Sequence, residues 1–402
     1  MSRGRITVVG LDGRPLAGEI ERLLGDAALV AGGRRHLETL GVDRDRALIL
    51  EGDLSGALAR IEGSGGPVVV LASGDPGFFG IVRLLAGRFG REKLRVLPGL
   101  SSVALAFARA GLSWDDAVTV SAHGRDPRRA VNVCLANPKV AVLTSPDFGP
   151  AELAKALGGL DRTFVVAEKL GEKGERVFQG DAGTIAGMEW VEPNMVLVLD
   201  EARMPGGRGW ISSSLQSAWR WALPEEEFEH RSGMISKSAT RAFVLSRLGP
   251  GSGDLIWDVG AGSGSVAIEC ARLGGAAIAV ERDPESCACI RRNAERHGVR
   301  LQIIRAAAPE ALRSLPEPDA IFVGGTGGDF EEIVKLCAVR ARRAVVLALV
   351  TLERVVPAAQ LLEDCGLEVE TTFQQVSRMK GVGALHRLAA ESAVFIVSGS
   401  RL

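Results

Sequence analysis

The chain has 402 residues, which is long enough for two domains that each bury a hydrophobic core. Its 48 basic and 49 acidic side chains leave a formal net charge of -1, so we expect no general attraction to nucleic acid or to an anionic membrane surface. Glycine accounts for 50 residues, well above its usual share of about 7%, and much of the excess falls at the ends of predicted strands.

Short apolar segments alternate with helical stretches through the first half of the chain, which predicts an α/β sheet. The predicted strands are residues 6–9, 68–71, 94–97, 118–120, 140–143, 164–167 and 195–199. Polar or glycine-rich turns follow six of these strands, at 10–13, 73–76, 98–102, 121–125, 144–146 and 168–171. Because ligands bind at the carboxyl ends of strands in open α/β sheets, the first half is predicted to bind a ligand.

The sequence changes in character after Asp200, where clustered Pro, Gly, Ser and Trp replace any strand pattern. We therefore predict a first domain over 1–200, a linker over 201–233 and a second domain over 234–402. Strands and helices alternate again in the second domain. Its predicted strands are residues 255–258, 276–280, 301–304, 320–323, 344–350 and 393–397.

The first strand of the second domain ends at Asp258 and runs through Gly260, Gly262 and Gly264 into an amphipathic helix. Glycines let the backbone turn tightly and approach a ligand closely. A dinucleotide-binding loop has the pattern Gly-x-Gly-x-x-Gly, but here Ser265 stands at its last position. A carboxylate at 258 would repel a pyrophosphate, whereas it suits a ligand with an ammonium and a sulfonium group. The loop therefore favours S-adenosylmethionine.

Glu281 ends the next predicted strand, where a carboxylate is placed to accept hydrogen bonds from both ribose hydroxyls of a nucleotide. NAD and S-adenosylmethionine both need this contact, so Glu281 alone does not distinguish them. Together with Asp258 and the glycine spacing, it favours a methyltransferase over a dehydrogenase, and either over a glycine turn without a ligand.

The six cysteines are scattered and none forms a CxxC pair, so we expect reduced thiols in a cytoplasmic protein and no metal site. The longest apolar run, residues 344–350, is too short to cross a membrane, and no secretory signal is expected.

Several motifs of the second domain together resemble one enzyme family. They lie at 258–266, 281–284, 291–293, 309–312, 318–319, 323–325, 350–353 and 376–378. These residues resemble the decarboxylating precorrin methyltransferases of cobalamin synthesis, which implies a Rossmann-like class I methyltransferase fold. The implied cofactor contacts are Asp258, Gly260, Ala261, Gly262, Ser263, Gly264, Glu281, Arg282 and Ala308.

The first domain resembles the tetrapyrrole methylases in residues 73–76, 98–102 and 168–170. This resemblance implies a fold of two α/β subdomains and a second site for S-adenosylmethionine. The implied contacts are Gly10, Gly74, Asp75, Pro76, Ser101, Ser102, Thr144, Glu168 and Leu170.

The chain departs from both family patterns at one place each. Tetrapyrrole methylases usually open with Gly-x-Gly-Pro-Gly-Asp, and this chain has only Gly10 and Gly13 in the corresponding turn. In the second domain Ala307 replaces the acid expected near the adenine amino group, so adenine must be held by backbone groups or by shape.

The two domains in this order resemble fused precorrin methyltransferases. The resemblance implies that S-adenosylmethionine methylates carbons 5 and 15 of precorrin-6Y, that carbon dioxide leaves the acetate side chain of ring C, and that precorrin-8 results. The second domain would methylate carbon 15 and decarboxylate, and the first would methylate carbon 5. A homo-oligomer, either a dimer or a tetramer, is also implied.

A tetrapyrrole substrate carries many carboxylates, so arginine and lysine are expected at its site. The candidate catalytic and substrate-binding residues of the second domain are Lys237, Arg241, Thr351, Glu353 and Arg378. The alternative interpretation of each is an ordinary solvated side chain.

Two other functions are open at this point. One is methylation of RNA or of another metabolite, which is disfavoured because residues 324–328 hold glycines in place of Asn/Asp-Pro-Pro-Tyr and the chain has no tyrosine. The other is a tetrapyrrole-binding protein whose first domain has lost its cofactor site, as the shortened turn at 10–13 suggests.

Overall fold

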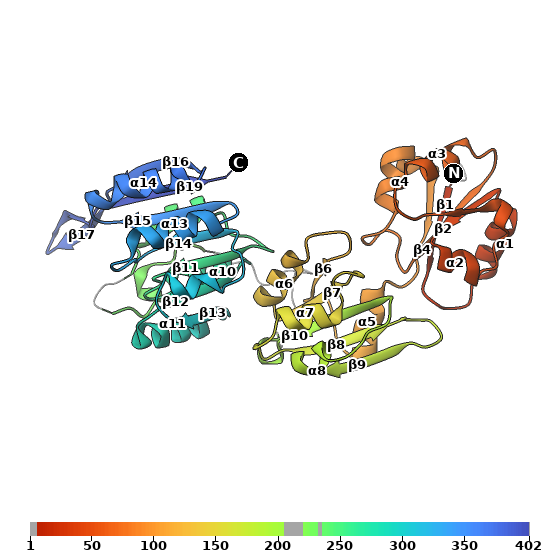
Figure 1. Cartoon of the computed structure of the whole chain (residues 1–402), viewed down its shortest axis with the longest axis horizontal. Helices are drawn as coiled ribbons and strands as arrows, with labels where there is room; N and C mark the ends of the chain where they lie inside the picture. The colour runs from red at the N-terminus through yellow and green to blue at the C-terminus, as the bar shows by residue number, and fades with distance from the viewer. Residues whose placement is uncertain (1–5, 205–219, 232–234, 402) are drawn as a thin grey trace. The chain divides into compact units, whose positions relative to one another are not determined.

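The computed structural model describes residues 6–204, 220–231 and 235–401. The chain divides into two compact units, the N-terminal unit (1–125 with 141–201) and the C-terminal unit (126–140 with 202–402) (Figure 1). This division differs from the predicted domains because residues 126–140 group with the second unit. Part of the predicted linker lies outside the described residues, and the rest contains the short 3-10 helices η3 (Glu201–Arg203) and η4 (Glu225–Glu227).

The first sheet of the N-terminal unit is parallel and has the strand order β3-β2-β4-β1-β5. Successive residues of β1 face opposite sides, since the fully buried Val8 and Val9 belong to two different hydrophobic cores. The strands predicted at 6–9, 68–71 and 94–97 are confirmed, whereas β2 and β3 were not predicted. The elements are β1 (Ile6–Leu11), α1 (Gly18–Asp26), β2 (Leu29–Gly32), α2 (Arg34–Thr39), η1 (Arg44–Arg46), β3 (Ala47–Ile49), α3 (Ser55–Gly63), β4 (Val68–Ser73), α4 (Val82–Phe89), η2 (Arg91–Lys93) and β5 (Leu94–Leu97).

A second sheet follows, with the strand order β6-β7-β10-β8-β9. Within this sheet, β8 pairs antiparallel with both β10 and β9. The predicted strands of this region are confirmed, and β9 is additional. The elements are α5 (Ser102–Ala110), β6 (Val118–Ser121), α6 (Pro127–Ala136), β7 (Lys139–Leu143), α7 (Pro150–Ala156), β8 (Thr163–Glu168), β9 (Arg176–Gly180), α8 (Ala182–Ala186) and β10 (Asn194–Leu199).

The sheet of the C-terminal unit has the order β13-β12-β11-β14-β15-β19-β16. The first five strands are parallel, and β19 runs antiparallel to β15 and β16. Because the chain continues from β11 to one side and later returns to its other side, the carboxyl end of β11 is the point where a ligand is expected. The strands are β11 (Leu255–Val259), β12 (Ala276–Glu281), β13 (Gln302–Arg305), β14 (Ala320–Val323), β15 (Ala344–Leu349), β16 (Glu368–Gln374) and β19 (Val394–Ser400).

Helices cover both faces of this sheet, so the C-terminal unit has three layers. Trp257 packs in the core with α13 and α14, and its neighbour Ile256 packs with α9 and α10 on the opposite face. This arrangement confirms the predicted Rossmann-like methyltransferase fold. The helices are α9 (Ser238–Leu248), α10 (Ser265–Arg272), α11 (Pro284–Arg296), α12 (Glu310–Arg313), α13 (Phe330–Arg340), η5 (Leu352–Arg354) and α14 (Val355–Asp364).

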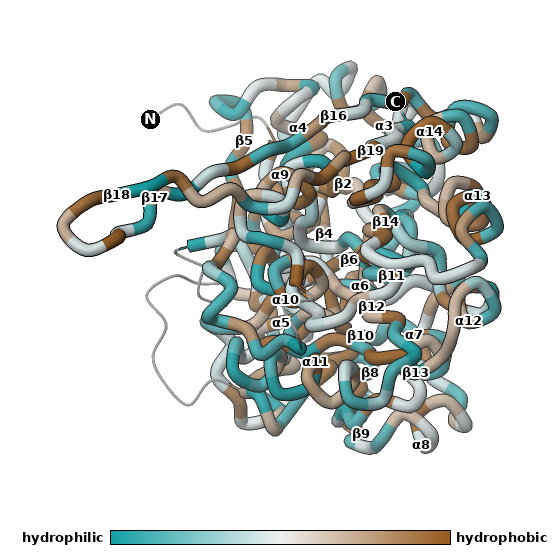
Figure 2. Tube along the Cα trace, turned by 90° about the vertical axis from the view of Figure 1, so that its left-hand side faces the viewer, coloured by the Kyte–Doolittle hydropathy of each residue, from teal (hydrophilic) through white to brown (hydrophobic). Residues whose placement is uncertain are grey.

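A hairpin of β17 (Ser377–Val382) and β18 (Leu385–Ala390) projects from the C-terminal unit, as both ribbon and tube views show (Figures 1 and 2). Met379 pairs with Leu388 across the hairpin, and these side chains are 70% and 69% exposed. The hairpin was not predicted from the sequence.

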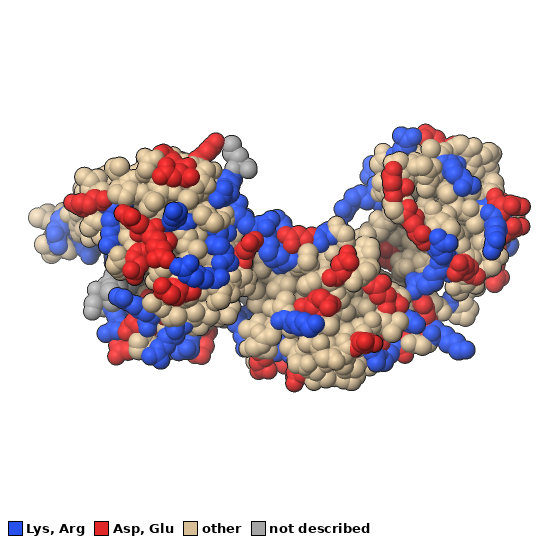
Figure 3. Space-filling model, in the orientation of Figure 1, with Lys and Arg blue, Asp and Glu red and all other residues tan. Residues whose placement is uncertain are grey.

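Both signs of charge are interspersed over the face of the molecule in Figure 3, in line with the near-zero net charge. Within the described residues, none of the helices is long and apolar enough to cross a membrane. The same residues contain no cluster of three or more His, Cys, Asp or Glu side chains suited to a metal ion.

Candidate active site

The glycine loop between β11 and α10 owes its composition to two physical constraints. Gly260, Gly262 and Gly264 all have positive φ, at 68°, 55° and 71°, a region that other residues seldom adopt. A Cβ on Gly260 would also lie 2.3 Å from the carbonyl oxygen of Gly325, and one on Gly264 would lie 2.8 Å from Ile290 Cγ2. The loop therefore packs against both the turn after β14 and helix α11.

Asp258 is turned into the protein. Its side chain is 1% exposed, and Oδ2 accepts a 3.0 Å hydrogen bond from the backbone N–H of Ala267 in the first turn of α10. Burial raises the pKa of this carboxyl to about 7, and the nearby charge of Glu281 acts in the same direction. Asp258 does not line the cavity described below. Its hydrogen bond instead links β11 to α10.

Glu281 lies at the carboxyl end of β12 and is partly exposed. Its Oε2 accepts a 2.9 Å bond from the N–H of Gly262, and its Oε1 accepts a 3.0 Å bond from the N–H of Asp283. A carboxylate oxygen has two lone pairs, so each oxygen keeps the capacity to accept one more hydrogen bond. Glu281 is thus fixed by the backbone and still able to bind hydroxyl groups.

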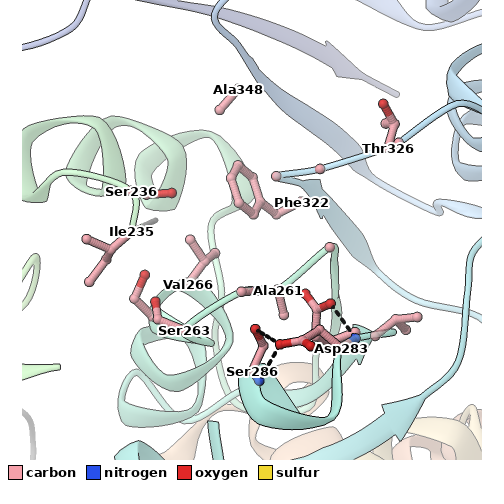
Figure 4. A pocket seen from close by; sticks show the side chains of 18 of the residues that line it. Ile235, Ser236, Ala261, Ser263, Val266, Asp283, Ser286, Phe322, Thr326 and Ala348 are labelled. Carbon is pink, nitrogen blue, oxygen red and sulfur yellow. Dashed lines mark hydrogen bonds between the residues drawn. The ribbon is translucent and has the colours of Figure 1, made fainter. Parts of the chain in front are cut away.

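A cavity of about 760 Å³ opens at the carboxyl ends of β11, β12 and β14 (Figure 4). Figure 4 shows Ala261, Ser263 and Val266 from the glycine loop and the start of α10, together with Phe322 from β14 and Ala348 from β15. Asp283 begins α11 at the cavity and accepts bonds from the N–H and the hydroxyl of Ser286, at 2.8 and 2.7 Å. Asp258 and Gly264 do not line the cavity. The predicted cofactor residues that line it are Gly260, Ala261, Gly262, Ser263, Glu281, Arg282 and Ala308.

Among the predicted substrate-binding residues, only Lys237 lines this cavity. Thr351 and Glu353 are exposed at the start of η5, outside the lining. Arg378 lies on β17, where it donates to Glu391 at 2.5 Å and to the hydroxyl of Ser238 at 2.6 Å.

Arg241 lies in the interior and away from the cavity. Its side chain is fully buried beside Glu269, with 3.4 Å between Nε and Oε1, and its guanidinium stacks on Phe228. It also donates to the carbonyl oxygens of Ser236 and Leu223. The structure therefore corrects its predicted substrate contact, because a side chain enclosed in this way does not reach the cavity.

The cavity also includes residues that were not predicted from the sequence. They come from α9 and the segment before it, from the start of α11, from the turn after β14 and from the start of β19: Arg231, Ile235, Ser236, Thr240, Asp283, Ser286, Thr326, Gly327, Asp329, Ser392 and Val394. The sequence held two signals: Asp283 before Pro284, a typical helix start at the end of a strand, and the glycine loop 324–328 after a predicted strand.

A second cavity, of about 700 Å³, lies in the N-terminal unit. The turns after β1 and β8 form parts of its wall, and Gly74, Ser102 and Leu170 are the predicted cofactor residues that line it. The two turns touch, since a Cβ on Gly13 would lie 1.6 Å from the carbonyl oxygen of Gly171. The turn at 10–13 is therefore shaped to fit the turn at 168–171.

Other predicted residues of the N-terminal unit hold its turns in place. A Cβ on Gly10 would lie 2.0 Å from the carbonyl oxygen of Gly74, so the β1 and β4 turns pack closely. Asp75 accepts the N–H of Gly77 at 2.8 Å, and Ser101 caps α5 by accepting the N–H of Ala104 at 3.1 Å. The remaining members are outside the lining: Pro76 is buried beside Gly80, Thr144 donates to the carbonyl oxygen of Asn194, and Glu168 is buried and bonded to Arg176.

Comparison with known proteins also divides the chain into two parts. Residues 16–186 match the family model of tetrapyrrole (corrin/porphyrin) methylases, and residues 226–401 match a precorrin methyltransferase domain. A precorrin-6Y C(5,15)-methyltransferase (decarboxylating) from Sinorhizobium sp is 40% identical over 342 residues, which are 81% of this chain and 79% of that protein.

Two shorter relatives each cover about half of the chain. A probable cobalt-precorrin-6B C(15)-methyltransferase (decarboxylating) from Pyrobaculum calidifontis is 35% identical over 45% of this chain and 97% of its own length. A cobalt-precorrin-7 C(5)-methyltransferase from Salmonella typhimurium is 34% identical over 49% of this chain and 99% of its own length.

The glycine loop, Glu281 and the strand order of the C-terminal unit define an S-adenosylmethionine-dependent methyltransferase, joined to a tetrapyrrole methylase unit. The chain belongs to the family of the decarboxylating precorrin-6Y C5,15-methyltransferases.

Proposed function

We propose that the protein methylates precorrin-6Y at carbons 5 and 15 in cobalamin biosynthesis, with S-adenosylmethionine as the methyl donor, and releases carbon dioxide from the acetate side chain of ring C. The C-terminal unit methylates carbon 15 and decarboxylates. The N-terminal unit methylates carbon 5.

The observation that carries this proposal is the presence of a large cavity in each unit. Each cavity touches turns at the carboxyl ends of strands, after β1 and β8 in the N-terminal unit and after β11, β12 and β14 in the C-terminal unit. Since each unit matches its own methylase family, the two cavities support two sites for the same cofactor.

The residues around the C-terminal cavity fit S-adenosylmethionine. A volume of about 760 Å³ lies within the usual range for sites of small molecules and cofactors. Glu281 is suited to the ribose hydroxyls, as described above. Ala306, Ala307 and Ala308 form one part of the lining, and their small side chains leave room for a flat adenine base.

The main task of the chain is to position the substrate. Bound S-adenosylmethionine supplies a methyl group that is already activated by its sulfonium. The protein must hold the nucleophilic ring carbon in line with that methyl at roughly 3–3.5 Å, which accounts for a large part of such catalysis. Phe322, Ala348 and Val350 offer apolar surface to the macrocycle.

Lys237 is suited to bind a carboxylate of the substrate. It lines the cavity, and the carboxylate of Glu225 is near enough to interact electrostatically with its ammonium group. Thr351, Glu353 and Arg378 stay predictions for substrate contacts.

Incubation of the protein with precorrin-6Y and S-adenosylmethionine, followed by mass spectrometry, tests the function. The expected product has gained two methyl groups and lost carbon dioxide. Methyl transfer to RNA without any change in precorrin-6Y would contradict the proposal. Calorimetry with S-adenosylhomocysteine is expected to give two sites per chain, and a single site would contradict cofactor binding by both units.

We also infer that the chain assembles with copies of itself. The exposed apolar side chains of the β17–β18 hairpin, among them Met379, Leu385 and Leu388, support this inference because such patches usually mark contact surfaces. Light scattering is expected to show a dimer or tetramer. A monomeric mass at micromolar concentration would contradict it.

A further inference from the structure

The turn after β14 forms one wall of the C-terminal cavity. It comprises residues 324–328, with four glycines around Thr326, and is called the acceptor loop. Its N-H groups at Gly324 and Gly325 both donate to the carbonyl oxygen of Val259, at 2.9 and 3.4 Å. These bonds fix the first half of the loop beside the glycine loop between β11 and α10, called the cofactor loop.

Arg354 holds the second half of the acceptor loop. Its Nη1 donates to Thr326 Oγ1 at 2.9 Å, and its Nη2 donates to the carbonyl oxygen of Gly327 at 3.1 Å. Its guanidinium carbon lies 5.1 Å from the ring centre of Phe330, at the start of α13. Among the described residues no carboxylate lies within ion-pair distance of Arg354, so its contacts are made to the loop and to this ring.

The position of Arg354 explains why an arginine is suited to this task. Arg354 ends η5, directly after β15, and β15 is the neighbour of β14 in the sheet. A planar guanidinium can bond a hydroxyl and a carbonyl through two different nitrogens while its flat face stacks on a ring, whereas a lysine ammonium has a single nitrogen and no flat face. A loop with four glycines loses much conformational entropy when it is ordered. It therefore depends on these contacts to stay in one conformation.

Arg354 does not itself line the cavity, whereas Thr326 and Gly327 do (Figure 4). We propose that Arg354 is a positioning residue for the carbon 15 methyl transfer: it keeps the acceptor loop in the conformation that seats the substrate against the methyl donor. This inference rests on the function proposed above for the C-terminal unit.

Arg340 provides a matched control, because it makes the same kinds of contact away from the cavity. Its guanidinium donates to the carbonyl oxygens of Leu312, Arg313 and Leu315 and lies 5.2 Å from the ring centre of Trp257. Loss of either arginine removes at least one hydrogen bond to a backbone carbonyl and a contact with an aromatic ring. Only loss of Arg354 removes them from a loop that lines the cavity.

The test compares Arg354→Gln, Arg354→Lys and Arg340→Gln in the full chain, with steady-state carbon 15 methylation, calorimetry with S-adenosylhomocysteine, and thermal unfolding. Arg354→Gln is expected to lower kcat about 10- to 100-fold, while the affinity for S-adenosylhomocysteine changes less than about twofold. Arg354→Lys is expected to recover part of kcat because it keeps one donor contact. Arg340→Gln is expected to lower the Tm and leave kcat near that of the unaltered protein.

A wild-type kcat in Arg354→Gln would overturn the role of Arg354, and so would an equal fall in kcat in Arg340→Gln. A kcat that falls only in step with the folded fraction would assign Arg354 to stability alone and overturn it too. The unaltered protein separates the two proposals: if it transfers no methyl group to carbon 15, the proposed function itself fails.

Thr326→Val supplies a second line of evidence. It removes the hydroxyl that accepts from Arg354 but keeps the volume of the side chain, so a smaller fall in kcat is expected than in Arg354→Gln. Since the two residues act through one contact, the double variant is expected to lose less than the product of the single losses. Multiplicative losses would contradict a shared role.

Discussion

Gly260 and Gly325 approach so closely that a Cβ on Gly260 would lie 2.3 Å from the carbonyl oxygen of Gly325. The first glycine of the cofactor loop is therefore required by its contact with the acceptor loop as well as by its own φ of 68°. The two loops that must bring donor and acceptor together are in direct backbone contact.

Gly260→Ala is expected to disturb both loops. The positive φ alone costs a residue with a Cβ roughly 1–2 kcal/mol, and the contact with Gly325 must open in addition. We expect the Kd for S-adenosylhomocysteine to rise about tenfold or more and the carbon 15 methylation to be largely lost. Gly381→Ala, at a site with open space around it, is the control. Equal affinities in the unaltered protein and in Gly260→Ala would contradict this argument.

Asp258 is expected to make the stability of the C-terminal unit depend on pH. Its pKa is raised from 3.8 to about 7, so the folded state retains a proton that the unfolded state loses. Stability from this group is thus fully present below about pH 4 and is lost as the pH rises towards 7, by an amount on the order of 4 kcal/mol.

Urea unfolding at pH 4.5 to 8 measures this effect when the protein is compared with Asp258→Asn, which does not titrate. The stability of the unaltered protein relative to the variant should fall as the pH rises to about 7 and then level off. A constant difference across this range would show that the carboxyl titrates normally.

Glu281 is expected to account for much of the cofactor affinity of the C-terminal unit. Glu281→Ala removes the acceptor for the ribose hydroxyls and leaves the N–H groups of Gly262 and Asp283 unpaired. Binding of S-adenosylhomocysteine should weaken by about 1–3 kcal/mol, and only at one of the two sites. Glu332→Gln, an exposed change on α13, is the control. Unchanged binding at both sites in calorimetry would remove Glu281 from the site.

The strands that could be predicted from the sequence are those whose apolar pattern agrees with their burial in the fold. The strand 255–259 is buried along its whole length and apolar except for Asp258, and the glycines after it mark its end. By contrast, β3 has only three residues and β17 is exposed along its whole length, so neither shows an apolar period. Such strands depend on their sheet partners, which sequence periodicity does not reveal.

The candidate site was predictable in position but less so in side-chain direction. Asp258 and Glu281 both stand at strand ends, yet Asp258 turns to the N–H of Ala267 and Glu281 reaches the cavity. Spacing places a residue near an edge of the sheet, and burial then decides which way it faces. Residues such as Ser236 and Thr326 come from distant segments that only tertiary packing brings to the cavity.

Replacement of Arg241 is expected to lower stability, and replacement of Lys237 is expected to weaken substrate binding, although the two residues lie only one helical turn apart. Arg241→Gln leaves Glu269 buried without one of its two cations, so the free energy of unfolding should fall by roughly 3–5 kcal/mol. Lys237→Gln removes a charge that lines the cavity, so it should raise KM for the tetrapyrrole several-fold with little change in Tm. Steady-state kinetics and urea unfolding of both variants check this contrast. Should Arg241→Gln keep its stability and raise KM, Arg241 would regain the substrate role that its charge first suggested.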